Sequence, residues 1–306
     1  MISKTLRPHS IGASCAIAAA FLFSTKAIFI KQAYALSPLV DATLLMALRM
    51  ASALPFFLII AWYSRQRYHS ITAKDWALLI LSGLMGYYFS SWLDFLGLMY
   101  ISASLERIIL FLYPTLTVIA SAAIYKKPLG LKAILAIILS YGGTVLVMLQ
   151  EQSHTPHDAN FWLGASLVFA SAILFSIYLL LTPRLMQKFG SLHFTGLALS
   201  IACIGMMLHF WIATPEPFQL LTQLPLGIWG YGLALGLLVT VLPTILLMQS
   251  IVRLGPGQSA MIASVGPILT ILLAVALLNE HLNTWQWLGC ILNMLGVCMI
   301  TLNKNK

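Results

Sequence analysis

Ten apolar stretches of about 20 residues follow one another along the chain, and each is long enough to cross a bilayer as a helix. The stretches cover residues 11–30, 39–62, 76–99, 104–124, 131–149, 161–182, 192–213, 228–251, 258–278 and 284–302. The main links are short and carry proline, charge and histidine: 64–75, 126–132, 151–160, 183–191 and 214–227. Barrel strands are excluded because the runs are about twice the length that such a strand needs and do not alternate. The sequence therefore predicts an all-α integral membrane protein with ten transmembrane helices.

The composition agrees with a lipid environment. Hydrophobic residues make up 60% of the 306 positions, and only 8% are Asp, Glu, Lys or Arg, against about 25% in a soluble domain. So few charges cannot cover the surface of a water-soluble protein of this size, which excludes the soluble, disordered and nucleic-acid-binding classes. The expected partners are a lipid bilayer and a small-molecule substrate, with no nucleic acid, and the sequence does not distinguish a monomer from a homodimer.

The distribution of Lys and Arg predicts the orientation of the helices, because these residues favour cytoplasmic loops. With a cytoplasmic amino terminus, thirteen of the 17 fall inside: Lys4, Arg7, Arg65, Arg67, Lys74, Lys126, Lys127, Lys132, Arg184, Lys188, Arg253, Lys304 and Lys306. Lys31 falls outside, and the others lie within spans. The acidic residues Asp41, Glu151, Asp158, Glu216 and Glu280 fall outside, with Asp75 inside. We expect a multi-pass protein of the cell inner (cytoplasmic) membrane with both termini in the cytoplasm.

The amino-terminal segment imitates a signal peptide. Lys4 and Arg7 precede an apolar run, and Ala33-Tyr34-Ala35 resembles a cleavage site. The run is too long for the apolar region of a signal peptide, and Lys26 interrupts it. We interpret the segment as an uncleaved first span.

The second half of the chain repeats the first. A shift of 153 residues, without gaps, places Trp76 on Trp229, Gly83 on Gly236, Pro114 on Pro267, Thr117 on Thr270, Leu129 on Leu282 and Gly143 on Gly296. Any two leucine-rich helices align to some extent, but this match extends over four consecutive spans. Since each unit has five spans, an odd number, the copies should have opposite orientations, as in many secondary transporters. The sequence predicts two inverted five-helix repeats, 1–150 and 151–306.

These features resemble the drug/metabolite transporter superfamily, specifically its ten-span EamA type. The family's repeat has a mid-helix proline, an apolar run, a Gly-Glu-x-Leu-like turn and a last helix with small residues. The second copy has Pro267-Ile268-Leu269-Thr270, Asn279-Glu280-His281-Leu282, Gly289 and Gly296, and the first has Pro114-Thr115-Leu116-Thr117, Lys126-Lys127-Pro128-Leu129 and Gly142-Gly143. Lys127 departs from the pattern, since the family often has Glu there, whereas Arg49 matches the family's Arg in the second span. The resemblance implies a secondary transporter and leaves the substrate open.

Five ionisable residues lie within the predicted spans: Lys26, Arg49, Asp94, Glu106 and Arg107. Each costs about 2.5–3.5 kcal/mol at a helix centre, so each is a functional candidate. Lys26, Glu106 and Arg107 are expected near the outer surface, where long side chains can extend to water. Arg49 lies mid-span and is expected to line a cavity or to pair inside the bundle, as is Asp94. Glu106 and Asp94 are the candidates for proton coupling, because only a group that changes charge can carry a proton.

Polar residues recur at helical spacing on two pairs of spans. In the fourth span they are Glu106, Tyr113, Thr117 and Ser121, and the 153 shift maps them onto Ser259, Gly266, Thr270 and Ala274. In the third span they are Tyr87, Ser91 and Asp94, with Thr240, Thr244 and Leu247 as their images. We expect these stripes to line a central pathway, although hydrogen bonding between helices and close packing give the same pattern.

Prolines and aromatic residues complete the candidate pathway. Pro114, Pro243 and Pro267 fall inside spans, where each removes a backbone hydrogen bond and favours a hinge or helix break. Trp92, Tyr113 and Tyr178 are candidates for stacking on a substrate, or else for packing and interface anchoring. The four cysteines have no C-x-x-C spacing, and the chain has no Walker A, G-x-S-x-G or H-E-x-x-H motif. We therefore expect no metal, no cofactor and no catalytic residues.

Three functions remain open, the first two within the class of transporters, whereas no specific feature favours a channel or an assembly factor. The first is a secondary transporter that moves small polar metabolites, amino-acid-like or organic acids, by alternating access, with export as the direction implied by the resemblance. The second is an importer of a nutrient, vitamin or nucleoside with the same fold. The third is an intramembrane enzyme or lipid-handling protein, for which only Asp94 and Glu106 approach a catalytic pair. The three basic and two acidic residues within the spans leave a formal charge of +1, which favours substrates that carry a carboxylate.

Overall fold

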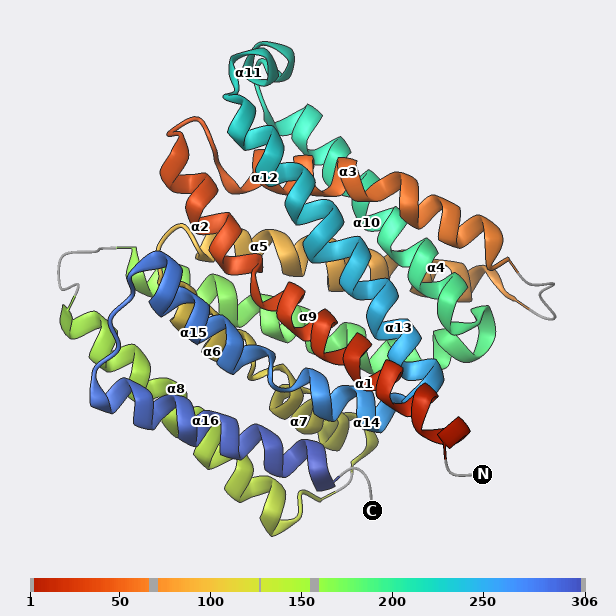
Figure 1. Ribbon diagram of the computed structural model, residues 1–306, viewed down its shortest axis with the longest axis vertical. Coiled ribbons are helices and arrows are strands. Elements are labelled where there is room, and N and C mark those ends of the chain that lie inside the picture. The colour runs from red at the N-terminus through yellow and green to blue at the C-terminus, as the bar shows by residue number, and fades with distance from the viewer. Residues whose placement is uncertain (1–2, 66–70, 127, 155–159, 304–306) are drawn as a thin grey trace.

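The computed structural model describes residues 3–65, 71–126, 128–154 and 160–303, and every element within them is a helix (Figure 1). The first half contains α1 (Ser3–Ser24), α2 (Lys26–Leu36), α3 (Ala42–Tyr63), α4 (Ala73–Gly83), the π-helix η1 (Leu84–Phe89), α5 (Ser90–Gly97), α6 (Ala103–Leu110), α7 (Tyr113–Tyr125) and α8 (Leu131–His154). The second half contains α9 (Phe161–Phe189), α10 (Ser191–Ala213), α11 (Pro217–Gln223), α12 (Leu226–Gly236), the π-helix η2 (Leu237–Val241), α13 (Leu242–Leu254), α14 (Pro256–Ala263), α15 (Gly266–Leu278) and α16 (Thr284–Asn303). Arg67, Lys127, Asp158, Lys304 and Lys306 of the charge count lie outside the described residues.

Nine helical segments of the described chain are long and apolar enough to cross a membrane. They are Ser10–Leu36, Ala42–Tyr63, Ala73–Gly97, Ala103–Ile124, Leu131–Gln152, Phe161–Phe189, Ser191–Ala213, Leu226–Leu254 and Gly257–Leu278. They coincide with the first nine predicted stretches. The tenth stretch is also helical, but its apolar described part, Thr284–Ile300, is shorter. The protein is an all-helical, multi-pass membrane protein.

Several predicted links are helical instead. The first span continues through α2 to Leu36, so Lys31 and the cleavage-site-like triplet at 33–35 belong to a helix. Likewise, α8 continues to His154, and α9 continues through Pro183 to Phe189. Membrane helices tolerate proline because neighbouring groups satisfy the freed backbone atoms. The link at 214–227 contains α11, which begins at Pro217, a residue whose fixed φ suits a first helical turn.

The helix boundaries of the two halves are in register. Adding 153 to the bounds of α4, α6 and α7 gives the bounds of α12, α14 and α15. The same shift moves the start of η1 onto the start of η2 and the start of α8 onto the start of α16. Lys126 and Asn279, also 153 residues apart, follow α7 and α15 in the left-handed conformation, with φ of 51° and 54°. Breaks, π-helices and helix ends thus recur at one spacing.

The packing of the helices is reciprocal between the halves. The first helix of each half packs against the third and fourth spans of the other: α1 lies on α13, α14 and α15, and α9 lies on α5, α6 and α7. The second spans, α3 and α10, pack against each other, and so do the last helices, α8 and α16 (Figure 1). The start of α1 and the end of α16 lie at the same end of the bundle (Figure 1). These contacts between the first, second and last helices of the two halves therefore recur with the halves exchanged.

Glycines permit the close crossing of α8 and α16. A Cβ atom on Gly143 would lie 2.4 Å from the Gly289 carbonyl oxygen, and one on Gly296 would lie 2.4 Å from the Ala136 carbonyl oxygen. Asn293 fastens the crossing, because its Nδ2 donates to the Ser140 carbonyl at 3.2 Å and to Thr144 Oγ1 at 2.8 Å. Small residues therefore let the two backbones meet here, as is usual between membrane helices.

We expect Gly143→Ala to destabilise the protein and the neighbouring Gly142→Ala to leave it unchanged or slightly more stable. The new methyl at position 143 meets backbone atoms that cannot move away, and overpacking of this kind costs about 1–3 kcal/mol. At Gly142 an added Cβ meets nothing within 4 Å, and alanine is the better helix former by about 1 kcal/mol. Thermal unfolding of the purified proteins in detergent measures both effects. Equal unfolding temperatures for the two variants would show that the crossing is not tight.

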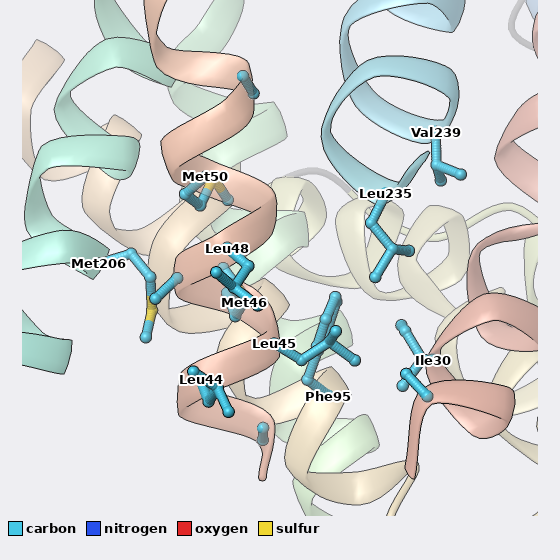
Figure 2. Close-up of a cluster of buried hydrophobic side chains, with 14 of the residues drawn as sticks. Ile30, Leu44, Leu45, Met46, Leu48, Met50, Phe95, Met206, Leu235 and Val239 are labelled. Carbon is cyan, nitrogen blue, oxygen red and sulfur yellow. The ribbon is translucent and has the colours of Figure 1, made fainter. Parts of the chain in front are cut away.

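The middle of α3 lies at the centre of the largest apolar cluster. The seven consecutive residues from Leu44 to Met50 are all buried, so this part of α3 is enclosed on every side. Figure 2 shows Met206 of α10 on one side of α3, and Phe95, Ile30, Leu235 and Val239 on the other. The one charged residue in this run is Arg49, which is therefore held deep among apolar side chains.

Candidate functional site

Irregular helical segments gather the polar side chains of the bundle. The first span breaks at Thr25, so Lys26 is the first residue of α2. The fourth span breaks at Phe111 and Leu112, which separates α6 from α7. The third and eighth spans contain the π-helices η1 and η2, whose wider turns change the direction of the side chains that follow. Breaks and π-helices of this kind are found where backbone borders a binding site.

Lys26, Asp94, Glu106 and Arg107 form a buried ion cluster. Lys26 Nζ lies 2.5 Å from Asp94 Oδ2 and 3.1 Å from Glu106 Oε1, and Arg107 Nε lies 3.8 Å from Glu106 Oε2. The side chains of Asp94 and Glu106 are 3% and 0% exposed, and that of Lys26 is 14% exposed. The cluster joins α2, α5 and α6, and its two cations balance its two carboxylates.

Lys26 and Glu106 do not extend to the protein surface, because their side chains are 14% and 0% exposed and contact each other inside the bundle. Lys26 turns inward because the break at Thr25 places its side chain opposite Asp94 and Glu106. Two carboxylates in a medium of low dielectric constant attract the ammonium group more strongly than a partly hydrated surface does. Sequence reasoning gave Lys26 less weight than Asp94, although Lys26 is the residue that bridges the two acids.

Arg49 lies apart from this cluster and contacts the second half of the chain. Its Nε donates to Thr240 Oγ1 at 2.8 Å, and its guanidinium carbon lies 5.4 Å from the centroid of the Phe95 ring. Thr240 belongs to η2, and its hydroxyl also donates to the Leu235 carbonyl five residues earlier, at 2.8 Å. Arg49 thus has a hydrogen-bond partner inside the bundle, and whether it also lines a cavity stays a prediction. Since Phe95 follows Asp94 on α5, the two charged sites are neighbours.

Aromatic side chains pack between the third, fourth and sixth spans. The Tyr87 and Tyr178 hydroxyls lie 3.1 Å apart, and the ring centroids of Tyr113 and Phe175 are 5.1 Å apart. Phe175 and Tyr178 also contact each other, with centroids 5.6 Å apart. An added Cβ on Gly86 would lie 2.3 Å from Tyr178 Cγ, so η1 approaches α9 closely. The structure thus brings Tyr87, Tyr113 and Tyr178 into one aromatic group.

Trp92 belongs to a second polar aromatic group, which sequence reasoning missed. Its Nε1 donates to Thr43 Oγ1 at 3.2 Å, and its ring centroid lies 4.8 Å from that of His209. The Tyr88 hydroxyl and His209 Nδ1 are 2.9 Å apart. The sequence interpretation placed most histidines in loops, but His209 lies within α10. Its position inside a predicted span, where a polar ring needs a partner, is the signal that could have identified it.

The predicted polar stripes do not persist as continuous faces. Tyr87 lies in η1 and faces α9, whereas Asp94 lies in α5 and faces α2, because the π-helix changes the angular spacing between them. Ser91 is half-buried on α5. The other hydroxyls bond locally. Thr117 donates to the Tyr113 carbonyl, Thr244 to the Thr240 carbonyl, Thr270 to the Gly266 carbonyl, and Ser259 to the Gly255 carbonyl while also pairing with Ser250. Four of these contacts reach back four residues along the chain, and only the pair of Ser259 with Ser250 joins two helices, which is the hydrogen bonding between helices predicted as the alternative to a pathway.

The predicted hinge prolines all lie in the first turn of a helix that follows an irregular segment. Pro114 and Pro267 are the second residues of α7 and α15, which follow the breaks in the fourth and ninth spans. Pro243 is the second residue of α13, which follows η2. A proline in a first turn leaves no hydrogen bond unmade, so each is compatible with the new helix. Whether they act as hinges stays a prediction.

Two carboxylates hold the start of α6. Glu280 accepts hydrogen bonds from the backbone N–H groups of Ala103 and Ser104, at 2.7 and 3.1 Å. Glu151 accepts from the Ser102 backbone N–H at 3.0 Å and from its hydroxyl at 2.9 Å. Negative charge at a helix N-terminus is favourable, because backbone donors there lack partners within the helix. Glu280 thereby links the second half of the chain to the helix that carries Glu106.

Among the residues that the structure describes, no group of three or more His, Cys, Asp or Glu side chains is arranged to hold a metal ion. The charged and aromatic groups around α2, α3, α5, α6 and η2 are the candidate site for a small polar molecule. Such a site, at the junction of broken and π-helical segments from both halves, is typical of transporters.

Comparison with known proteins identifies the family. The EamA-like transporter family matches twice, over residues 10–149 and 162–302. The chain is 29% identical to the uncharacterized transporter YcbK of Bacillus subtilis, over 88% of this chain and 85% of that protein. It is 25% identical to the uncharacterized transporter YyaM of the same organism, over 82% and 81% of the two chains. A solved crystal structure with 19% sequence identity shares the fold, with a TM-score of 0.62 over 97% of this chain and 98% of that one. The protein therefore belongs to the EamA-like transporter family.

Proposed function

We propose that the protein is a secondary transporter that exports small polar metabolites, amino-acid-like or organic acids, across the inner membrane by alternating access. The observation that carries this proposal is the buried charged site at the junction of the two halves, in a chain of a transporter family. Charged groups inside a membrane bundle are costly and mark substrate or ion pathways. The related proteins are named as transporters, which is consistent with a protein that is not an enzyme.

Ten spans in two inverted repeats, residues 1–150 and 151–306, form the transporting unit. The recurrence of breaks, π-helices and left-handed helix ends at a spacing of 153 residues supports the repeat. The reciprocal packing of each first helix on the other half supports an approximate two-fold relation between the copies. In transporters with this design, one repeat rocks against the other around a site near the midplane.

The substrate binds between the halves. The pathway consists of Arg49, Tyr87, Ser91, Trp92, Asp94, Glu106, Tyr113, Thr117, Tyr178, Thr240, Thr244, Ser259 and Thr270. Within this set, Arg49 with Thr240 and the ion cluster around Lys26 supply charge, and the two aromatic groups supply flat apolar surface. A small molecule with a charged end and an apolar end finds both kinds of partner here.

Closure at one end of the pathway depends on the start of α6. Glu280 contacts α6 from the other half of the chain, so movement of the halves apart has to break its two backbone hydrogen bonds. The images of Glu280 and Glu151 under the 153 shift are Lys127 and Lys304, so the sequence offers no matching carboxylates for the start of α14. The two ends of the pathway are therefore closed by different contacts.

We expect cells that lack the gene to release less of the exported metabolite than wild-type cells. Quantification of the metabolites in culture medium, with and without the gene, identifies the compound. Transport of that labelled compound by proteoliposomes, with and without an imposed pH gradient, then separates direct transport from an indirect effect. Proteoliposomes that move none of the compounds identified in this way would refute the proposed function.

We expect a cysteine at position 216 to react with a membrane-impermeant maleimide from outside the cell, and a cysteine at position 253 to be protected. Glu216 and Arg253 are both exposed on the protein surface, and the excess of Lys and Arg places the two on opposite sides of the membrane. Glu216→Cys and Arg253→Cys in a background without native cysteines form a matched pair. Permeabilised cells should label both, and the reverse pattern in intact cells would overturn the proposal that both termini are cytoplasmic.

A further inference from the structure

Arg49 is a buried cation that forms no ion pair among the described residues, and the nearest carboxylate that attracts it, Asp94, is already paired with Lys26. Arg49 is 8% exposed and lies in the enclosed part of α3, between Leu44 and Met50. Within the described residues, the ion pairs of the spans involve Lys26, Arg107 and Lys188, and none involves Arg49. An unpaired charge in a low-dielectric interior is unfavourable unless something compensates it.

The nitrogen atoms of the Arg49 guanidinium differ in whether they donate a hydrogen bond. Nε donates to Thr240 Oγ1 at 2.8 Å, and the group lies over the Phe95 ring. Nη1 is buried and has no hydrogen-bond acceptor among the described residues. The two contacts hold the planar group in one orientation, and they leave a strong donor without a partner. Unsatisfied buried donors are rare in proteins and call for an explanation.

The surrounding charges determine which kind of group can bind to Nη1 of Arg49. The neighbouring cluster is balanced, since Lys26 and Arg107 face Asp94 and Glu106. Of the five ionisable residues within the predicted spans, Arg49 is the one that lies outside this balanced cluster. A monovalent anion restores neutrality, whereas a phosphate dianion would leave a buried negative charge. Guanidinium groups match the planar shape of a carboxylate, and hydrogen bonds between the two are among the strongest in proteins.

We propose that Nη1 of Arg49 binds the carboxylate of the substrate, while Thr240 holds the guanidinium in place through Nε. This inference rests on the proposed transport function and specifies the group that the site recognises. Because Thr240 lies in the π-helix of the second half and Arg49 in the second span of the first half, the carboxylate binds at the junction that moves during transport. Arg49 is then the residue that makes the site bind acids in preference to their neutral derivatives.

The competing explanation is that Arg49 only fastens η2 to α3. In that case its replacement lowers thermal stability but leaves the selectivity between acids and amides unchanged. Thr240→Val distinguishes the two, because it removes the acceptor of Nε and leaves the charge of Arg49 in place. Under our proposal Thr240→Val weakens the binding of acids in part, and Arg49→Gln abolishes the preference for acids.

The experiment uses the purified full-length protein in detergent. Binding is measured by thermal shift with the twenty L-amino acids and a series of straight-chain mono- and dicarboxylic acids, each paired with its primary amide. We expect at least one acid to bind the wild type and its amide not to bind. Arg49→Gln should lower the affinity for that acid about 10- to 100-fold, which corresponds to the loss of a hydrogen bond to a charged group. Arg49→Lys should recover part of the affinity, and Arg253→Gln, at an exposed arginine that donates hydrogen bonds to Gln249 of its own helix, should change nothing.

Three results would overturn the inference. They are an amide that binds as tightly as its acid, an unchanged affinity for acids in Arg49→Gln, and no binding by any acid of the series. Transport by the same variants in proteoliposomes separates this failure from failure of the proposed function. If a compound is transported regardless of its carboxylate and of Arg49, the transport function stands and the carboxylate site is refuted. If the wild type transports nothing, the function itself is refuted.

Discussion

Replacement of Lys26 with methionine is expected to lower the free energy of unfolding by about 3–5 kcal/mol and to abolish transport, because it leaves two buried carboxylates without their shared partner. Lys26 Nζ contacts both Asp94 and Glu106, and the side chains of these acids are at most 3% exposed. Arg107 lies 3.8 Å from Glu106 alone, so it cannot replace Lys26 at Asp94. The repulsion between the two acids then acts without compensation.

Thermal unfolding in detergent and transport in proteoliposomes measure the two effects. Lys132→Met, at an exposed lysine at the start of α8, serves as the control and should leave both unchanged. The triple variant Lys26→Met, Asp94→Asn, Glu106→Gln removes the charges together, so it should recover most of the stability without recovering transport. A Lys26→Met protein with wild-type stability and transport would show that the cluster is neither structural nor functional.

The sequence predicted the helices well because length and hydropathy determine a membrane helix almost locally. The spacing of 153 residues between Pro114 and Pro267 also anticipated that the helix breaks recur, since both prolines follow a break. By contrast, the polar stripe of Tyr87, Ser91 and Asp94 assumed a regular helix. The π-helix Leu84–Phe89 changes the directions of the side chains that follow it. No residue type in that segment predicts a π-helix.

The partners of the charged residues could be predicted only in part. The sequence predicts that Asp94 lines a cavity or pairs inside the bundle, and it pairs with Lys26. The inward direction of Lys26 depends on the break at Thr25, which has no proline or glycine to mark it. Contacts such as Arg49 with Thr240 join residues 191 positions apart. They follow from how the halves pack, and a single sequence contains no direct record of that packing.

Asp94→Asn and Glu106→Gln are expected to reduce or remove the pH dependence of transport, if the protein couples transport to protons. The ion cluster is neutral as built, with Lys26 shared between α5 and α6 through these two acids. A proton on either acid cancels its attraction for Lys26 and releases the lysine from that helix. Protonation would therefore change which of the two helices is tied to α2, and this links a proton to the relative position of the third and fourth spans.

The measurement is the rate of transport in proteoliposomes at several imposed pH gradients, for the wild type and each variant. Glu216→Gln, at an exposed acid that precedes α11, provides the control and should keep the wild-type profile. An asparagine or glutamine cannot take up a proton in this range, so the variant at the coupling residue should transport at a rate that no longer follows the gradient. If both variants keep the wild-type profile, or if the wild type itself is indifferent to the gradient, then neither acid carries the proton and the cluster serves to hold α2, α5 and α6 together.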